Sequence, residues 1–278
     1  MNVVLLTGVA TDAQLRYTPN GKPILNFRIA GVRTIQRGDG QTADVFSSHI
    51  VSLYGERAER WAALIGDDPL PQAVHAQARL RSYATDQPDG SKRYGTSIDI
   101  DQLHFLPGDH EIKQGEYGPL LVGGASRALL LGNVTRDGEL RYTGNGNAVA
   151  NLNIAVNEYN PVTKESRGNF ITVTAWGEAL ANTAAECTKG TPVRVAGAVV
   201  LSSWDDRDGN KRYQLRVNAD EILRLASPAY QGDDRPARTA PTTAPAAATS
   251  ARPAAPAKPA ARQLDIDEEF PPEENLPF

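Results

Sequence analysis

The strongest constraint on the fold is an internal repeat. Residues 15–30 read LRYTPNGKPILNFRIA and residues 140–155 read LRYTGNGNAVANLNIA, with nine of sixteen positions identical. Three further blocks recur in the same order: LLTGVATDAQ with LLLGNVTRDGE, VSLYGERA with VTAWGEAL, and DGSKRYGTSI with DGNKRYQLRV. Four blocks in one order, at a nearly constant offset, indicate a duplicated domain of about 110 residues.

Each copy has the same predicted elements. Segments such as ILNFRIAGV and VANLNIAV alternate apolar with polar residues, which is typical of half-buried strands. GERAERWAALIG and GEALANTAAECTKG have helical spacing and end in glycine. Hairpin signals stand at matching places in the two copies, namely Asn20-Gly21 with Asn145-Gly146 and Asp89-Gly90 with Asp208-Gly209.

This order of elements predicts a mainly β protein. Five strands with one helix between the third and the fourth match the OB barrel, and a small β-sandwich is the alternative on pattern alone. We therefore expect two OB domains in tandem, at residues 1–106 and 127–226, joined by an ordered Gly/Pro-rich connector at 107–126. Residues 227–263 are rich in Pro, Ala and Thr and predict a disordered spacer, which residues 264–278 follow as an acidic tail.

Charge is divided unevenly along the chain. The formal net charge is −4, from 29 Lys and Arg against 33 Asp and Glu. Six of the acids lie in the tail, which has no basic residue: Asp265, Asp267, Glu268, Glu269, Glu273 and Glu274. Without them the balance is 29 against 27, a net charge of +2 for the rest of the chain. A mildly basic body with an acidic tail is expected to bind a polyanion with the body.

An enzymatic function is not indicated. The four histidines, His49, His75, His104 and His110, all lie in the first copy or the connector, so no catalytic base recurs in the second. The single cysteine, Cys187, has no histidine near it in sequence and is expected to be a small core residue. No phosphate loop, metal spacing, signal peptide or membrane span is found, so we expect no cofactor and a cytoplasmic location.

Aromatic and basic residues recur at matching places and favour nucleic-acid binding, in which bases stack on rings beside a basic groove. The second copy has Tyr159, Phe170, Trp176, Trp204 and Tyr213, and the first has Tyr54, Tyr83 and Tyr94. The cations beside them are Arg16, Arg28, Arg33, Arg79, Arg81, Lys92 and Arg93 in the first copy, with Arg141, Lys211 and Arg212 in the second. Tyr17 and Tyr142 are expected in the barrel cores, and Trp61 is expected to pack its helix against a barrel.

The chain resembles the bacterial single-stranded DNA-binding proteins. The resemblance is carried by LLGNVTRDGELRYTGNGNAVANLNIAV, WGEALAN, KGTPVRVAGAV, WDDRDGNKRYQLRV and the acidic tail ending in Pro277-Phe278. Two such domains in one chain look like the Deinococcus–Thermus type. At the stacking positions of the family, the first copy is read as Ser48, Tyr54 and Tyr83, and the second as Phe170, Trp176 and Trp204.

The resemblance implies OB folds and sequence-independent binding of single-stranded DNA in replication, recombination and repair, in a nucleoid-associated protein. It also implies four barrels in each functional unit, hence a homodimer, and a tail that docks partner enzymes. In such a tail the acids steer toward basic pockets, and Leu276, Pro277 and Phe278 form an apolar anchor. A duplicated OB protein that binds RNA and an enzyme with OB domains remain as alternatives.

Overall fold

The computed structural model describes residues 1–36, 40–66, 72–86, 90, 92–160, 164–205 and 211–226. The predicted spacer and acidic tail therefore lie outside the described residues. The elements are β1 (Asn2–Tyr17), β2 (Pro23–Gln36), β3 (Thr42–Tyr54), α1 (Glu56–Gly66), β4 (Gln72–Asp86), β5 (Lys92–Phe105), β6 (Ile112–Gly115), β7 (Gly118–Val122), β8 (Ala125–Val134), β9 (Glu139–Tyr142), β10 (Ala148–Asn160), β11 (Glu165–Trp176), α2 (Glu178–Ala185), β12 (Pro192–Asp205) and β13 (Lys211–Arg224).

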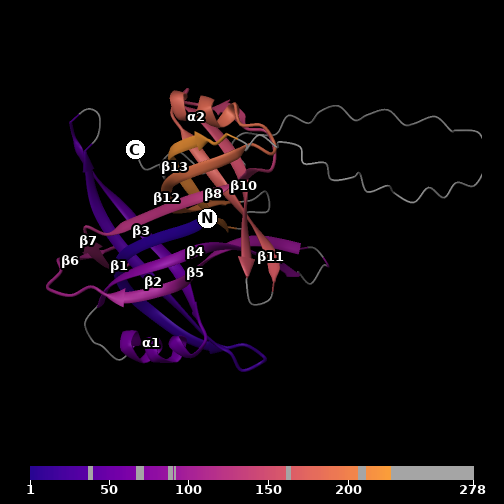
Figure 1. The fold of residues 1–278 in the computed structure, drawn as a ribbon. Coiled ribbons are helices and arrows are strands. Elements are labelled where there is room, and N and C mark those ends of the chain that lie inside the picture. The colour runs from indigo at the N-terminus through magenta and orange to yellow at the C-terminus, as the bar shows by residue number, and fades with distance from the viewer. Residues whose placement is uncertain are drawn as a thin grey trace, which may run out of the picture.

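Each copy closes into a five-stranded barrel. In the first, β1 pairs with β2 and β4, β2 pairs with β3, β4 pairs with β5, and a parallel bridge from β3 to β5 closes the ring. The second repeats this with β8, β10, β11, β13 and β12. The helices α1 and α2 stand between the third and fourth strands, at opposite ends of the molecule (Figure 1). The predicted OB architecture is confirmed, and closure rules out the sandwich.

The Asn-Gly turns form for the same reason in both copies. Gly21 and Gly146 adopt φ values of 73° and 81°, a region that costs little only when the side chain is absent. The amide of Gly21 donates to the carbonyl of Thr18, and that of Gly146 donates to the carbonyl of Thr143, each at 2.8 Å. These turns join β1 to β2 and β9 to β10, as the sequence predicts.

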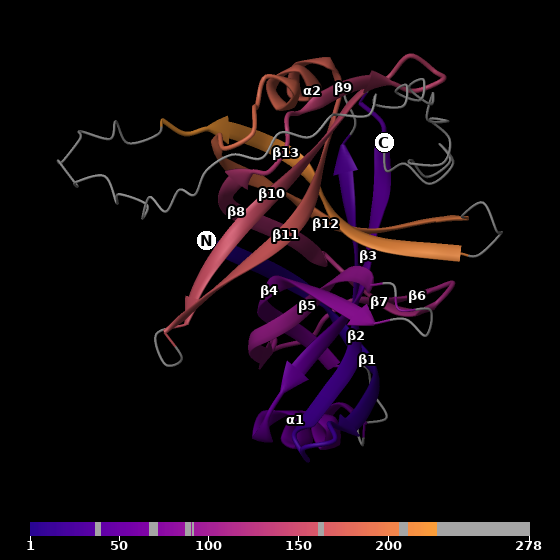
Figure 2. The same cartoon turned by 90° about the vertical axis from the view of Figure 1, so that its right-hand side faces the viewer.

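The two barrels are joined by a strand pairing that the repeat does not predict. β1 pairs antiparallel with β8, so one 13-stranded sheet runs through both barrels. Val4 pairs with Ala128, its own counterpart in the repeat, and Asn2 with Leu130 while Leu6 pairs with Ser126. Because counterparts exchange places across the ladder, the copies are related by an approximate two-fold axis. Figure 2 shows them stacked, with β1, β2, β4 and β5 below β10, β11, β12 and β13.

The segment between the two barrels contains a hairpin of β6 and β7. β7 adds in parallel to the edge of β2, and Leu121 packs beside Val9 and Ala73. A Cβ added to Gly31 would lie 2.7 Å from the Cα of Gly124. The hairpin can therefore seat only because both residues at this crossing are glycine.

Apolar burial supports both barrels together. One cluster of buried side chains includes Phe27 and Leu80 of the first copy and Leu130, Ile154 and Cys187 of the second. Cys187 is thus a core residue, as predicted. Trp61 on α1 packs against the same cluster, with its ring centroid 4.6 Å from that of Phe105. Among the described residues, no helix has the length and hydropathy needed to span a membrane.

Candidate nucleic-acid interface

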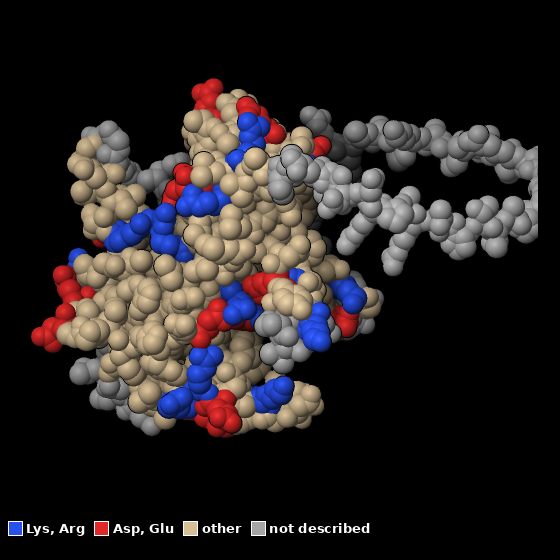
Figure 3. Space-filling view, viewed as in Figure 1, with Lys and Arg blue, Asp and Glu red and all other residues tan. Residues whose placement is uncertain are grey.

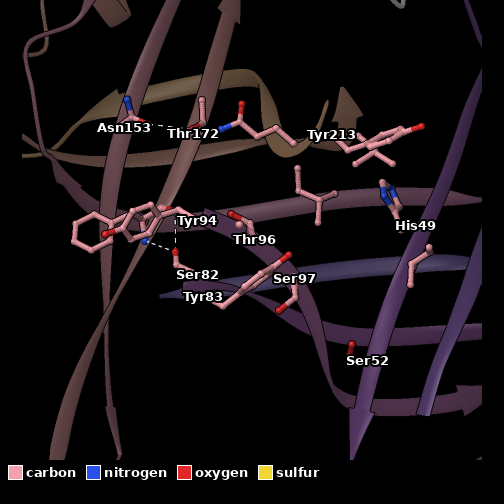
Figure 4. Close-up of a pocket in the computed structure, with 16 residues that line it drawn as sticks. His49, Ser52, Ser82, Tyr83, Tyr94, Thr96, Ser97, Asn153, Thr172 and Tyr213 are labelled. Atoms are coloured by element: carbon pink, nitrogen blue, oxygen red, sulfur yellow. Dashed lines mark hydrogen bonds between the residues drawn. The ribbon is translucent and has the colours of Figure 1, made fainter. Parts of the chain in front are cut away.

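A groove of about 800 Å³ lies at the junction of the two barrels. Strands β3, β4 and β5 supply one side, and β10, β11, β12 and β13 supply the other. The lining residues are His49, Ile50, Ser52, Ser82, Tyr83, Tyr94, Gly95, Thr96 and Ser97 from the first barrel, and Asn153, Phe170, Thr172, Leu201, Tyr213, Gln214 and Leu215 from the second (Figure 4). The site therefore exists only because the two copies are held together.

Four of the predicted stacking residues meet in this groove. Tyr83, Tyr94, Phe170 and Tyr213 are 47%, 76%, 62% and 56% exposed, respectively. Figure 4 shows Tyr83 and Tyr213 from the two barrels on opposite sides of the space, with Tyr94 at one end. Several exposed aromatic rings in one groove are typical of a binding surface, because hydration of so much apolar area is unfavourable.

Strand registers show which aromatic residues of the two copies are counterparts. Tyr54 pairs with Ile24 and Trp176 with Val149, so these two lie at equivalent places, as do Tyr94 and Tyr213. The sequence alignment treats Tyr83 and Trp204 as equivalent positions of the two copies, and this equivalence is wrong. Tyr83 pairs with Gly95, whereas Trp204 pairs with Arg212, whose counterpart is Arg93 opposite Thr85.

Tyr83 thus stands two residues closer to the barrel than the counterpart of Trp204, on the same face of the strand. A Cβ added to Gly95 would lie 2.5 Å from the ring of Tyr83. The ring therefore covers the backbone of its cross-strand neighbour. In the second barrel the same pair of positions is Ser202 opposite Gln214, so this aromatic platform belongs to the first barrel alone.

Hydrogen bonds across the junction fix one wall of the groove. Ser82 Oγ accepts from the amide of Phe170 at 2.7 Å and donates to the carbonyl of Phe170 at 2.9 Å. The amide of Ser82 donates to Asn169 Oδ1, and its carbonyl accepts from Arg167 Nη2. Every polar group of Ser82 is thus bonded to β11, which orients the ring of Phe170 without burying it.

His49 closes the other wall. It is 3% exposed, and its Nε2 lies 2.9 Å from Ser126 Oγ. Ser126 gives its own hydrogen to the carbonyl of Val199, so its oxygen accepts from a proton on Nε2 and the ring is the neutral Nε2–H tautomer. Burial lowers the pKa of His49 to about 4. His49 is therefore a packed residue of the barrel junction rather than a catalytic base.

The burial of His49 predicts a pH-dependent stability. In the unfolded chain the ring takes up a proton as the pH falls below about 6.5, whereas the folded protein resists protonation down to a pKa of about 4. Stability is therefore lost as the pH falls through this window, by about 2 kcal/mol between pH 7 and pH 5. Urea unfolding should show this loss in the wild type and a smaller one in His49→Gln, with His104→Gln as the control. Equal losses in the wild type and His49→Gln would contradict the burial.

Five of the ten predicted cations face carboxylates. Arg28 is 13% exposed, and its Nε lies 2.7 Å from Asp12 Oδ2, beside Gly118 of the connector. The other pairs are Arg79 with Asp101 and Glu158, Arg81 with Asp99, Lys92 with Asp86, and Arg141 with Glu139. On the face seen in Figure 3, Lys and Arg likewise lie in small groups beside Asp and Glu. No Lys or Arg is among the lining residues whose side chains the structure describes, so this described part of the groove is aromatic and neutral-polar.

The remaining predicted residues lie outside the groove or are described only by their backbone. Tyr54, Trp176 and Tyr159 lie on β3, β11 and β10, with Tyr159 near the hairpin end. Arg16 is exposed and donates to Gln14, and Arg33 is half-buried on β2. The side chains of four predicted residues fall outside the described set, and register alone places them: Arg93, Trp204, Lys211 and Arg212.

The expected core positions of Tyr17 and Tyr142 are wrong. Both side chains are exposed, because β1 and β9 have run past the barrel where these residues occur. The hydroxyl of Tyr17 donates to Glu59 on α1 at 2.9 Å. Sequence reasoning also missed Ile50 and Leu201, which line the groove with exposed side chains. Their alternation with buried neighbours on β3 and β12 was the available signal.

Fold and groove together define a protein of two OB barrels that present aromatic rings to a shared open surface. Residues 1–106 and 125–225 each match the model of the single-strand binding protein family. The chain belongs to this family.

Relatives of the same length support the assignment. The single-stranded DNA-binding protein of Thermus thermophilus is 37% identical over 99% of this chain and 97% of its own length. That of Deinococcus radiodurans is 36% identical over 100% of this chain and 99% of its own. The crystal structure of the wild-type single-stranded DNA binding protein from Thermus aquaticus superposes with a TM-score of 0.64 at 32% identity, covering 85% of this chain and 98% of that one. The predicted resemblance to the Deinococcus–Thermus type is confirmed.

Proposed function

We propose that this protein binds single-stranded DNA without sequence preference, and that the groove at the barrel junction is part of the binding surface. The observation that carries the proposal is the meeting of Tyr83, Tyr94, Phe170 and Tyr213, two from each copy, in one groove. Every base has a π-face, so rings of this kind hold any sequence. In a duplex the bases are stacked on one another, so no base face is available to these rings.

Neutral polar groups beside the rings fit the same ligand. Thr96 and Ser97 line the groove from β5, and Asn153, Thr172 and Gln214 are hydrogen-bonded in a row on the other side. Such groups exchange partners with base edges or sugar oxygens without demanding one base. Arg167, which is bonded to the carbonyl of Ser82, together with Arg93, Lys211 and Arg212 would contact phosphates and make binding weaken with salt.

The family relationship supports two further proposals about partners. Two chains are proposed to associate, which gives four barrels in each functional unit. The acidic tail is proposed to recruit enzymes of replication, recombination and repair, with Phe278 as the apolar anchor and its acids as the steering charge. Both proposals rest on the resemblance and on the sequence, since the tail lies outside the described residues.

Native mass spectrometry with a nucleic-acid mixture tests the proposed function. The protein is mixed with equal amounts of oligo-dT, an RNA of the same length and a duplex of the same length. The expected complex contains two chains and the oligo-dT, with little duplex bound. Duplex bound as well as oligo-dT would exclude the stacking mechanism, and a preference for RNA would favour the alternative function. A single chain carrying the oligo-dT would overturn the dimer alone.

A further inference from the structure

The first barrel lacks a ring where the second has Phe170. Phe170 pairs with Ala155 on β10, and its counterpart on β3 is Ser48, which pairs with Ala30 on β2. Neither ladder contains a bulge, so the two positions are equivalent in register. A serine hydroxyl offers no π-face to a base, and the first barrel would therefore have a gap in its stacking surface at this point.

An aromatic residue stands two positions away from that gap. Phe46 pairs with Val32 on β2 and is 65% exposed, which is unusual for a phenylalanine on a regular strand. Its counterpart in the second barrel is Gly168, which pairs with Asn157 and has no side chain. At these two equivalent positions each barrel thus has one phenylalanine, but the first barrel has it at position 46 and the second at position 170, the counterpart of position 48.

Strand geometry places Phe46 on the same face as the groove. Side chains on a strand alternate between faces, so Phe46, Ser48, Ile50 and Ser52 point to one side. Exposure follows this period, since Phe46, Ser48 and Ile50 are exposed, whereas Ser47 is half-buried and His49 and Val51 are buried. Ile50 and Ser52 line the groove, so the exposed face of Phe46 continues into it. Phe46 lies two positions from Ser48, a shift of about 7 Å along the strand.

We propose that Phe46 is a base-stacking residue of the first barrel, with the role that Phe170 has in the second; the inference rests on the proposed single-stranded DNA binding. The occupant is a nucleobase, because the face of Phe46 is continuous with a groove already lined by exposed rings. The strand of DNA that leaves the groove along β3 meets this ring next. The displaced ring makes the two barrels inequivalent in where they hold a base, although their folds are alike.

Substitution and relocation of the ring provide the test. Oligo-dT affinity is measured by fluorescence anisotropy at low and at high salt for the wild type, Phe46→Ala, Phe46→Leu and the double variant Phe46→Ala/Ser48→Phe. Loss of one stacked base predicts an affinity for Phe46→Ala that is about 5- to 150-fold weaker, with the difference retained at high salt. Phe46→Leu should remain weak, and the double variant should recover affinity because the ring returns to the face used by Phe170.

Tyr117→Ala provides the matched control, because Tyr117 is also an exposed aromatic residue but lies in the turn between β6 and β7. Its removal should leave affinity unchanged. If the wild type binds and Phe46→Ala binds equally well, or if Phe46→Leu restores full affinity, the stacking role of Phe46 is refuted while the proposed function stands. A wild-type chain that does not bind oligo-dT refutes the proposed function itself.

Discussion

Replacing Phe170 and Tyr94 together by alanine is expected to weaken oligo-dT binding by at least about 30-fold. Each stacked base contributes roughly 1–3 kcal/mol, and the two rings come from different barrels. Both are exposed in the free protein, so their removal costs no core packing. Fluorescence anisotropy with a labelled oligo-dT gives the affinity. Each single variant should show part of the loss, which would place one DNA strand on both barrels.

Tyr142→Ala is the control for this pair. Tyr142 is exposed on β9 and does not line the groove, so its loss should not change affinity. Urea midpoints of all variants should stay close to that of the wild type, since the hydrogen bonds between the Ser82 hydroxyl and the backbone of residue 170 are kept. Unchanged affinity in the double variant would show that the DNA binds elsewhere.

Deleting residues 270–278 is expected to abolish the capture of partner enzymes and to leave oligo-dT affinity intact or slightly tighter. The deleted segment holds two of the six tail acids and the whole apolar terminus. Partner affinity in such peptides is concentrated in one buried anchor, so Phe278→Ala alone should lose most of the capture. DNA affinity rises slightly if the acids compete with phosphates for the same cations.

Capture is compared by pull-down from a cell extract with full-length and truncated protein on the same support. Glu273→Gln is the matched control, because it removes one steering charge and keeps the anchor. It should weaken capture less than Phe278→Ala does. Retention of the same replication and repair enzymes by the truncated chain would show that recruitment uses another surface.

Local pattern was sufficient to predict the two barrels. Asn20-Gly21 and Asn145-Gly146 fix two hairpins through positive φ, and alternation along residues 24–32 and 149–156 fixes which face is buried. These signals act within a few residues, so they can be read from one copy at a time. The internal repeat then indicates that the same fold occurs twice.

The groove could not be predicted, because it depends on how the copies meet. The alternation of β1 and β8 does not indicate that Val4 will pair with Ala128, and without that ladder Tyr83 and Phe170 would not line one groove. The mismatch of Tyr83 with Trp204 has a related cause. A shift of two residues preserves the face of a strand, so alternation does not reveal it and only cross-strand register does.

Charge was the least predictable property of the site. The first copy has more basic residues near its aromatic positions, which predicts that its binding depends more on phosphate contacts and salt. In the structure Arg28, Arg79 and Arg81 lie against carboxylates, and the stronger salt dependence of the first copy stays a prediction. These ion pairs join residues that are distant in the sequence, so the sequence alone does not show that they are neighbours. We therefore expect stacking to be the main source of affinity for single-stranded DNA. The affinity should fall less steeply with salt concentration than the number of cations alone would suggest.

Photo-crosslinking identifies the residues that contact the bound DNA strand. An oligo-dT with 5-iododeoxyuridine at several positions is bound to the wild-type protein and irradiated, and the joined peptides are identified by mass spectrometry. We expect crosslinks to Tyr83 or Tyr94 in the first barrel and to Phe170 or Tyr213 in the second, from the same bound strand. Crosslinks confined to one barrel, or to residues such as Tyr117 and Tyr142 outside the groove, would contradict this expectation.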